Sequence, residues 1–449
     1  MELNLSAKLI LETLRNNGFE AYLVGGCSRD LILGLEPKDW DICTNAMPEQ
    51  VKEVFSEYMI LEIGIAYGTV TVVIDHEHFE ITTYRVDGEY KDGRHPTEVS
   101  LTTDLKKDLS RRDFTINAMA MDESGIIDYF GGKEDIQNKI IKCVGNPIER
   151  FNEDRLRILR AIRFACKLGF KIEENTLNAM KQFSKDTRNK VSPERLQMEL
   201  IKTIDCKYIF EVLSDETMAS IFFDIFPEFK PMFKFKQNNP HHIYDVWEHT
   251  LKAITFSDGY IQKLVALMHD MGKPIAYSVD ENGKGHFYGH PFASAKLADK
   301  FMRELNFSNY EREFIISIIQ RHHDTITPTK KSLLKYLSKV DISVLYGIIS
   351  FREADTLAQS DYERESKFDW IKQIQSVIAD VLTNNSSDKN NIFSIKDLDI
   401  NGNDIKELGF SEGKIIGNIL KELLNAVIEE KCQNTREQLI VYVQNKSWD

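Results

Sequence analysis

The chain has 449 residues, of which 42% are hydrophobic and 28% are charged, so its composition excludes a disordered or fibrous protein. Its net charge of −13 argues against a protein that coats nucleic acid indiscriminately, because such binding depends on Lys and Arg neutralising phosphates. Single hydrophobic cores stop growing near about 250–300 residues, so we expect about three or four domains. No apolar run reaches the ~18 residues of a membrane span, and the N-terminus lacks a secretory pattern, which predicts a cytoplasmic protein with no membrane partner.

The first 145 residues alternate helical and strand patterns. An amphipathic helix is predicted up to Asn17, with Gly18 as its stop. After it come the strand AYLV with two glycines, a short helix, the strand DWDICT, the helix PEQVKEVFSE, and strands around MILEIGI, GTVTVVI and FEITTYR. This order predicts an α/β (α+β) head.

From residue 146 onward nearly every window has helical periodicity, which predicts an all-α elongated body. The segments 230–242 and 383–391 interrupt that pattern with polar and turn-forming residues. We therefore predict a head over 1–145 and helical domains over 146–235, 236–365 and 366–449.

The six cysteines are scattered and form no CxxC pair, which excludes a structural zinc motif or a disulfide framework. We expect them to be reduced, small apolar residues. One stretch departs from the acidic balance of the chain, since residues 141–171 hold eight basic side chains against three acidic ones. A local surface of positive charge is therefore expected there.

A pair of acidic residues follows two glycines in LVGGCSRDLILGLEPKDWDICT, residues 23–44. Side chains alternate faces along a strand, so Asp39 and Asp41 are expected to point the same way, with Trp40 and Ile42 turned into the core. Two carboxylates so placed suit two Mg²⁺ ions, which clamp the attacking and leaving oxygens of an in-line phosphoryl displacement.

Gly25 and Gly26 lie between a strand and a helix, where backbone amides can approach a triphosphate, and Arg29 on that helix can add a charge-assisted bond. Either motif alone is more often an ordinary turn or a solvated strand end. The joint pattern, twelve residues between GG and the acid–apolar–acid–apolar run, resembles the signature of the DNA polymerase β nucleotidyltransferase superfamily. That resemblance implies a third acid on a neighbouring strand. Glu80 is our candidate, with a solvated strand residue as the alternative.

Further motifs follow in order: RRDFTINAMAMD (111–122), NEDRLRILRAIRFA (152–165) and SPERLQMEL (192–200). Together with the glycines and acids, they resemble the bacterial class II tRNA nucleotidyltransferases, the CCA-adding enzymes. The resemblance implies a nucleotidyltransferase head (palm), a neck that recognises the nucleotide base and tRNA, and a C-terminal tail that binds tRNA.

The neck motif places Glu153, Asp154 and Arg157 at i, i+1 and i+4 of a predicted helix, so Asp154 and Arg157 are expected to share a face. A carboxylate accepts from an exocyclic amine, and a guanidinium donates to a ring nitrogen or carbonyl oxygen. Cytosine and adenine both present an amine beside an acceptor, so one such pair could select CTP and ATP without a template. The alternative is an ordinary ion pair on a solvated helix.

The resemblance assigns that base-reading role to Asp154 and Arg157, and it implies further nucleotide-binding residues: Arg160 and Arg163 in the neck, and Arg112, Asp113 and Asn117 for the ribose 2′-OH and phosphates. The alternative for the RRD motif is a charge cluster at a helix N-terminus. The long polar segment 83–101 reads as a mobile loop. In this family a complete loop accompanies adenosine addition, which favours addition of CCA, or of A alone, over addition of CC alone.

A second constellation lies in the helical body, where VWEHTL supplies His249, ALMHDMGKP supplies His269 and Asp270, and FREADTLAQS supplies Asp355. This order resembles the HD phosphohydrolase superfamily and implies an HD-type helical domain over 236–365. His290 in GHPFASA, and His322 or His323 in QRHHD, are candidates for a second metal position.

Imidazole together with carboxylate suits Mn²⁺, Fe²⁺, Ni²⁺ or Zn²⁺, and a metal there would lower the pKa of a water and support hydrolysis of phosphate esters. Some bacterial CCA-adding enzymes with HD domains act as 2′,3′-cyclic phosphodiesterases in tRNA repair. The alternative is a helical spacer that kept its ligands without activity.

The sequence thus predicts template-independent addition of CCA to tRNA, with tRNA, ATP and CTP as partners, Mg²⁺ as cofactor, pyrophosphate as product and no obligate protein partner. A poly(A) polymerase, or a tRNA nucleotidyltransferase that adds A alone, would share the head. A rival of another class is an HD metal-dependent phosphohydrolase whose head only binds RNA. A non-catalytic tRNA-binding protein would leave Asp39 and Asp41 idle.

Overall fold

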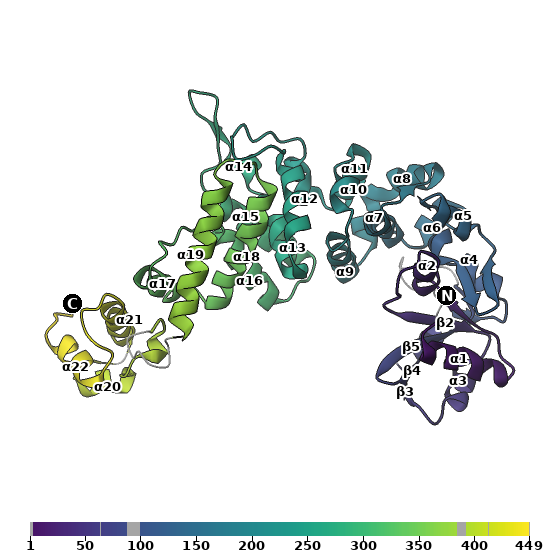
Figure 1. Ribbon diagram of the computed structural model, residues 1–449, viewed down its shortest axis with the longest axis horizontal. Coiled ribbons are helices and arrows are strands. Elements are labelled where there is room, and N and C mark those ends of the chain that lie inside the picture. Colours follow the sequence, from purple (N-terminus) through teal and green to yellow (C-terminus); the bar gives the residue numbers. More distant parts are fainter. Residues whose placement is uncertain (1–2, 63, 88–98, 384–391, 412, 449) are drawn as a thin grey trace. The chain divides into compact units, whose positions relative to one another are not determined.

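The computed structural model describes residues 3–62, 64–87, 99–383, 392–411 and 413–448. The chain separates into two compact units, Met1–Lys230 and Pro231–Asp449 (Figure 1). The predicted finer division at residues 145, 235 and 365 stays a prediction. No helix among the described residues is both long and apolar enough to cross a membrane.

A seven-stranded mixed sheet forms the centre of the first unit, in the order β3-β4-β5-β2-β1-β8-β9. The central strand β2 pairs antiparallel with β1 and parallel with β5. The remaining neighbours in the sheet are antiparallel. The strands are β1 (Ala21–Val24), β2 (Trp40–Thr44), β3 (Met59–Leu61), β4 (Thr69–Ile74), β5 (Glu77–Thr83), β8 (Met119–Asp122) and β9 (Gly125–Asp128).

The head core forms because alternate strand side chains and one helix stripe meet. Leu23 on β1, Ile42 on β2 and Ile81 on β5 are fully buried, and they share a cluster with Ile10 and Leu14. Those two residues belong to α1 (Leu5–Asn16), the helix that the sequence predicts to stop at Gly18. Burying this apolar stripe against the sheet fixes the strands that carry the site.

Helices surround the sheet and continue into the neck. They are α2 (Gly26–Ile32), α3 (Pro48–Val54), α4 (Leu105–Ser110), α5 (Gly132–Gln137), α6 (Pro147–Glu153), α7 (Leu156–Leu168), α8 (Glu174–Lys190), α9 (Pro193–Ile204), α10 (Ile209–Leu213) and α11 (Glu216–Ile225). A short parallel pair joins head and neck through β10 (Ile140–Ile141) and β11 (Lys171–Ile172). The neck is therefore helical as predicted, apart from one short strand.

A hairpin of β6 (Arg85–Asp87) and β7 (Val99–Leu101) extends from the head. Residues 88–98 between these strands lie outside the described residues, and they make up most of the predicted loop 83–101. The expectation of a mobile, complete loop therefore stays a prediction.

The second unit is built from helices with one small hairpin, formed by β12 (Ser278–Val279) and β13 (Gly285–His286). Its helices are α12 (Val246–Phe256), α13 (Gly259–Met268), α14 (Lys273–Ala276), α15 (His290–Glu304), α16 (Asn309–Arg321), α17 (Lys330–Leu337), α18 (Ile342–Ala358), α19 (Arg364–Thr383), α20 (Gly402–Glu407), α21 (Lys414–Ile428) and α22 (Arg436–Gln444). One apolar core joins α17, α18 and α19 to the C-terminal helices, with Leu345, Ile374, Ile419 and Leu439 among its buried residues.

Candidate functional sites: a charged cavity and a histidine cluster

A charged cavity of about 830 Å³ opens in the first unit. Of the catalytic and nucleotide-binding residues predicted in the head and neck, Glu80 lies outside its lining. The others all line it: Gly25, Gly26, Arg29, Asp39, Asp41, Arg112, Asp113, Asn117, Asp154, Arg157, Arg160 and Arg163. The charged cavity, as we call it below, therefore brings together residues that are up to 138 positions apart in the sequence, from Gly25 to Arg163.

The two glycines form the turn from β1 into α2. Gly25 has φ +75°, a conformation that favours glycine, and Gly26 begins the helix. A Cβ at Gly25 would lie 3.1 Å from Nη1 of Arg112 and 3.5 Å from Oδ2 of Asp41. The absence of a side chain therefore lets the turn approach both an arginine and a carboxylate on the cavity wall.

The acid pair lies at the start of β2. The strand begins at Trp40, one residue later than predicted, so Asp39 precedes it and Asp41 lies within it. Both carboxylates line the charged cavity, whereas Ile42 is fully buried in the head core and Trp40 packs against that core. The alternation expected for a strand therefore holds across this short segment.

Glu80 occupies the neighbouring strand β5, directly opposite Asp41 in the parallel register. Its side chain is exposed and lies outside the lining of the cavity. Burial, against the opposing effect of Arg112 and with smaller contributions from the charges of Glu80 and Asp39, raises the pKa of Asp41 to about 6. The carboxylates of Asp39 and Asp41, which repel each other at the cavity wall, form an oxygen-rich donor set that fits a hard divalent cation.

The RRD motif begins at the end of α4, where Asp108 anchors both arginines. Oδ1 of Asp108 lies 2.8 Å from Arg111, and Oδ2 lies 3.3 Å from Nη2 of Arg112. Burial alone would raise the pKa of Asp108, but Arg112 and Arg111 hold it below its usual value. The carboxylate therefore stays charged and keeps Arg112 directed at the turn of Gly25.

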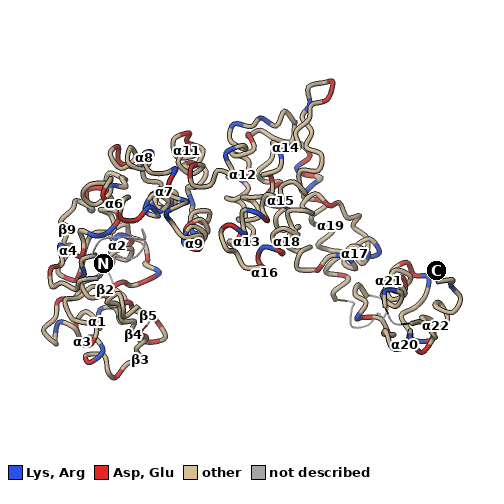
Figure 2. Tube along the Cα trace, turned by 180° about the vertical axis from the view of Figure 1, so that it is seen from behind, with Lys and Arg blue, Asp and Glu red and all other residues tan. Residues whose placement is uncertain are grey.

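Asp113, the acid of the motif, links the head to the neck. It accepts from Arg160 on α7 at 2.6 Å and from the Asn117 amide at 3.1 Å. Burial opposes its ionisation, but Arg160 and Asn117 hold its pKa well below the usual value. The Asn117 carbonyl in turn accepts from Arg29 at 2.6 Å, and Asp30 also pairs with Arg29 at 2.6 Å. These groups form one charged network, and Figure 2 shows the basic residues that recur along α7.

The expected shared helix face of Asp154 and Arg157 is wrong. α6 ends at Glu153 and α7 begins at Leu156, so Asp154 lies between the helices with extended backbone, at φ −144° and ψ 107°. Its Oδ1 accepts from the Leu156 amide at 3.0 Å, as a helix-capping aspartate does. The backbone breaks here because this aspartate caps α7.

The two base-reading candidates pair with other residues. Asp154 accepts from Arg195 on α9 at 2.6 and 3.2 Å, in a two-bond fork. Arg157 pairs with Glu153 at 2.6 Å and donates to the carbonyl oxygens of Arg111 at 2.9 Å and Arg150 at 3.1 Å. The simple ion pair between Asp154 and Arg157 is therefore replaced by two separately anchored groups.

Arg195 was not among the predicted site residues, although it lies within the motif SPERLQMEL. Its ion pair with Asp154 spans 41 positions, and no local periodicity indicates it. One helical turn further along α9, Glu199 pairs with Arg163. α9 therefore supplies one cation and one anion that pair with residues of the cavity lining, although neither Arg195 nor Glu199 lines the cavity itself.

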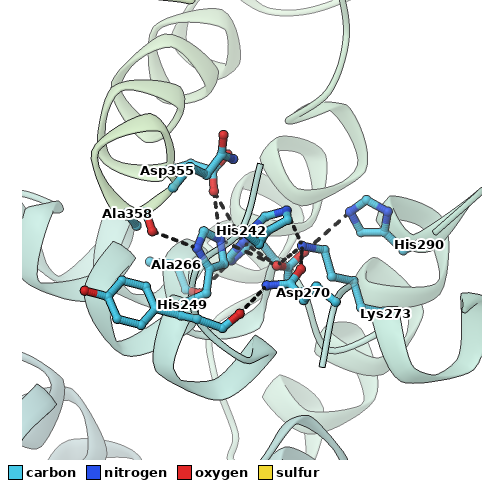
Figure 3. Close-up of polar contacts among 12 residues, drawn as sticks. His242, His249, Ala266, Asp270, Lys273, His290, Asp355 and Ala358 are labelled. Atoms are coloured by element: carbon cyan, nitrogen blue, oxygen red, sulfur yellow. Dashed lines mark hydrogen bonds and ion pairs between the residues drawn. The ribbon is translucent and has the colours of Figure 1, made fainter. Parts of the chain in front are cut away.

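In the second unit, a histidine cluster brings together side chains from five segments. Figure 3 shows His249, Asp270, His290 and Asp355 of this cluster. His249 lies on α12 and Asp355 on α18, and the pair His269–Asp270 follows α13 directly. His290 begins α15, and His322 follows α16. All six are buried.

The carboxylates lie between the imidazoles. Nε2 of His249 is 3.0 Å from Asp355 and 3.6 Å from Asp270, and Nε2 of His269 is 3.1 Å from Asp270. The second oxygen of Asp270 lies 3.4 Å from Nε2 of His290. Asp270 therefore faces histidines on both of its sides.

The four imidazoles are held by the same kind of contact. In each, Nδ1 contacts a backbone carbonyl oxygen: His249 with Ala358 at 3.3 Å, His269 with Ala266 at 2.8 Å, His290 with Phe287 at 2.8 Å and His322 with Ile319 at 2.6 Å. A proton on Nδ1 leaves the Nε2 lone pair free, which is how metal-ligating histidines are usually held. With the proton on Nδ1, the Nε2 lone pairs of His249, His269 and His290 face carboxylate oxygens 3.0, 3.1 and 3.4 Å away, which have no proton to donate. None of the four Nε2 atoms therefore forms a hydrogen bond among the described residues.

This donor set fits a divalent transition metal, because buried polar atoms without partners are costly unless a ligand satisfies them. Burial lowers the pKa of His290 and, most strongly, that of His322, which keeps them neutral. The ligand atoms fall into two groups within 4.8 Å: His249, His269 and Asp270 in one, and His290, His322 and His323 in the other. His290 and His322, which the sequence predicts for a second metal position, and the alternative His323 therefore fall in one group.

Three family models match the chain. The Poly A polymerase head domain matches residues 21–142, the probable RNA and SrmB-binding site of polymerase A matches 169–233, and the putative tRNA nucleotidyltransferase domain 2 matches 292–443. The first of these contains the acid pair and the RRD motif, and the second begins directly after α7.

Relatives match along nearly the whole chain. It is 32% identical over 437 residues to a CCA-adding enzyme of Ligilactobacillus salivarius, covering 96% of this chain and 94% of the relative. It is 30% identical over 444 residues to one of Staphylococcus saprophyticus, covering 98% of both. The crystal structure of the Bacillus stearothermophilus CCA-adding enzyme in complex with CTP superposes with a TM-score of 0.70, at 27% identity over 98% of this chain and 96% of that one. The chain therefore belongs to the CCA-adding enzymes, within the bacterial class II tRNA nucleotidyltransferases.

Proposed function

We propose that this protein adds cytidine and adenosine from CTP and ATP to the 3′ end of tRNA without a template, restoring CCA in the cytoplasm. One observation carries the proposal: a single cavity holds the diglycine turn, the acid pair and the base-reading side chains of the neck. A transferase needs these three functions within one nucleotide's length of each other.

The cavity residues divide the work of nucleotidyl transfer. Asp39 and Asp41 would hold Mg²⁺, which when bound stabilises the charge that develops on the transferring phosphoryl group. The Gly25 turn leaves room for the triphosphate, and Arg112 next to it supplies positive charge. Asp113 keeps Arg160 oriented across the cavity. The tRNA 3′-OH attacks and pyrophosphate leaves.

Base choice follows from the two anchored groups in the neck. Each carboxylate oxygen has two acceptor sites, so Asp154 can accept from an exocyclic amine while Arg195 holds it. Arg157 is held by Glu153 and by the carbonyl oxygens of Arg150 and Arg111, which fixes its guanidinium at the cavity wall, where it would donate to the base acceptor. Guanine and uracil would place like groups opposite both side chains, which a hydrogen-bonding site rejects.

The test is incorporation into tRNA that lacks its last three nucleotides, with labelled CTP and ATP. Two cytidines followed by one adenosine support the proposal. A long ladder of adenosine indicates a poly(A) polymerase, and adenosine added only to tRNA ending in CC indicates the A-adding variant.

The base-reading role has its own test. Arg157→Lys keeps the charge but loses the fork of donors, so it should raise misincorporation of UTP and GTP by about 10- to 100-fold, the range for a lost hydrogen-bonding contact. Unchanged selectivity would refute reading by Arg157, and tRNA binding measured in parallel separates selectivity from affinity.

A second function is favoured by the four Nε2 atoms of the histidine cluster, which form no hydrogen bond among the described residues. We propose that His249, His269, Asp270 and Asp355 hold a divalent transition metal, which when bound supports hydrolysis of a phosphate ester. Metal analysis of the purified protein and hydrolysis of nucleoside 2′,3′-cyclic phosphates with added Mn²⁺ or Ni²⁺ test this. A protein that binds no transition metal would have the cluster as a helical spacer only.

A further inference from the structure

A second cavity, of about 480 Å³, opens directly beside the histidine cluster. Asp355, His290 and His323 from the cluster line it, and so does Lys273. Its volume is within the range of small-molecule sites, about 300–1,000 Å³. A molecule in this cavity would therefore lie against the atoms that we expect to hold the metal.

The cavity carries an excess of positive charge. Lys273, Arg352 and Lys367 line it, and among its described lining residues the one carboxylate is Asp355. Lys273 also pairs with Asp270, outside the lining, at 2.7 Å, so the excess of positive charge comes from Arg352 and Lys367. Neutral groups contact the two outer cations. Lys367 donates to Gln359 at 2.5 Å, while Arg352 stacks on Trp370 at 4.2 Å and donates to the Asp324 carbonyl oxygen. Cations that lack a carboxylate partner at a cavity wall suit a phosphate.

An aromatic platform forms one edge of the same cavity. Tyr288 is 79% exposed, and its ring stacks on His286 at 5.3 Å with an interplanar angle of 6°. His286 belongs to β13 and is held by Asp280 at 2.9 Å. A large exposed ring, already oriented by a second ring, can stack a base without first losing rotational freedom.

The platform is coupled to the cluster through the backbone. Tyr288 precedes the candidate ligand His290 by two residues. The carbonyl oxygen of Phe287, which lies between the platform residues His286 and Tyr288 in the sequence, accepts from Nδ1 of His290. The phosphate-binding and base-stacking elements are therefore fixed relative to each other over a few residues.

We propose that Tyr288 is a specificity residue that stacks the base of a nucleoside phosphate, while Lys367 and Arg352 bind its phosphate beside the histidine cluster. This inference rests on the proposed hydrolysis, and it assigns recognition of the nucleobase to Tyr288 and of the phosphate to Lys367 and Arg352. A free nucleotide and the 3′-terminal nucleotide of an RNA share this chemistry.

Kinetics on the full-length, metal-loaded protein test the stacking. Tyr288→Ala should raise KM for a nucleoside 2′,3′-cyclic phosphate by about tenfold, whereas Tyr288→Phe should leave it unchanged because stacking needs only the ring. Neither variant should change KM for glycerol phosphate, which has no base. The matched control is Tyr310→Ala, because Tyr310 is also 79% exposed and stacked, on Phe314, but is not part of the cavity lining. Equal effects of Tyr288→Ala and Tyr310→Ala would overturn the inference.

Ultraviolet cross-linking gives a readout that does not need hydrolysis. An RNA oligonucleotide ending in a 2′,3′-cyclic phosphate, and the corresponding mononucleotide, should each be tested for cross-links to the peptide containing Tyr288. A cross-link with only one of them identifies the source, and no cross-link with either overturns the inference. If no phosphate ester is hydrolysed but the cross-link forms, the hydrolase proposal fails and the base site stands.

Discussion

The charged cavity of the first unit and the histidine cluster of the second both concentrate titratable side chains. The two regions differ in the partners that these side chains find within the protein. In the cavity, charges of opposite sign pair with one another, as Arg195 does with Asp154 and Arg160 with Asp113. In the cluster, buried Nε2 atoms lie 3.0–3.4 Å from carboxylate oxygens but form no hydrogen bond among the described residues.

The difference indicates what each region is built to receive. Paired charges at an open cavity can exchange a protein partner for a substrate group at little cost, which suits a nucleotide that enters and leaves. Buried polar atoms without partners cost about 1–3 kcal/mol each until something satisfies them. This contrast supports the proposals of a resident cation for the cluster and of successive substrates for the cavity.

Separate inactivation of the two regions should give the largest effects. Asp41→Asn should lower nucleotide incorporation by at least about 10³-fold, because losing a metal ligand forfeits several kcal/mol of transition-state stabilisation. It should leave transition-metal binding by the cluster unchanged. Asp270→Asn should do the reverse, lowering metal binding and hydrolysis but not incorporation.

Incorporation assays and metal titrations on both variants, with melting curves as a control for folding, complete this cross-comparison. If either variant removes both activities while its melting temperature is unchanged, the two regions do not act independently.

The next largest effect is expected from removing Gln359, which orients the cluster residue Asp355. Gln359 donates to Oδ2 of Asp355 at 2.7 Å, which directs the other oxygen at His249. Gln359→Ala should weaken transition-metal affinity by about 10- to 100-fold, the usual cost of losing a group that orients a ligand. Gln262→Ala is the control, since Gln262 also bonds to α18, at the Gly347 carbonyl oxygen, but away from the cluster. Competition with a chelator measures both, and equal affinities would contradict the orienting role.

Within the cavity, the anchor of Asp154 gives a smaller effect. Arg195→Ala removes both bonds that orient this carboxylate, so discrimination of cytidine over uridine should fall by about tenfold, or about 1.4 kcal/mol. Arg195→Lys should restore part of it. Arg188→Ala, which removes an ion pair with Glu228 elsewhere in the neck, is the control for stability. Selectivity that changes equally in both variants would indicate a general loss of packing.

The sequence predicts local features of the cavity because short-range rules determine them. The strand–diglycine–helix order requires a turn with positive φ, and strand alternation places Asp39 and Asp41 on one wall. Glu80 is found opposite Asp41 because two apolar strands of matching pattern pair in register.

Other features depend on tertiary contacts that no local pattern contains. The helical periodicity of NEDRLRILRAIRFA runs through Asp154, so the break between α6 and α7 is hidden unless the aspartate is read as a helix cap. Arg195 reaches Asp154 from 41 positions away, so only the fold brings the two together. The carbonyl oxygen that orients His269 lies three residues away, but which carbonyl oxygen contacts the ring depends on the ring's position in the fold. Sequence identifies the ligands here, but not their partners.

Competition between a proton and Mg²⁺ for the Asp41 carboxylate should give the smallest of these effects. It offers a further way to distinguish the charged cavity from the histidine cluster. Its folded pKa of about 6 exceeds the usual value of 3.8 because of burial, so the carboxylate is ionised above pH 6 and protonated below. Ionisation therefore opposes folding of the metal-free protein as pH rises between these values, and a bound cation offsets that cost.

The apparent Mg²⁺ affinity measured from incorporation should thus be about fourfold weaker at pH 5.5 than at pH 7.5, since roughly a quarter of Asp41 is then ionised. Glu80→Gln removes a neighbouring charge that raises this pKa, so the fall in affinity should move to lower pH. A flat Mg²⁺ dependence over this range, in both proteins, would contradict a buried carboxylate at the metal-binding wall and would remove the electrostatic link between β2 and β5.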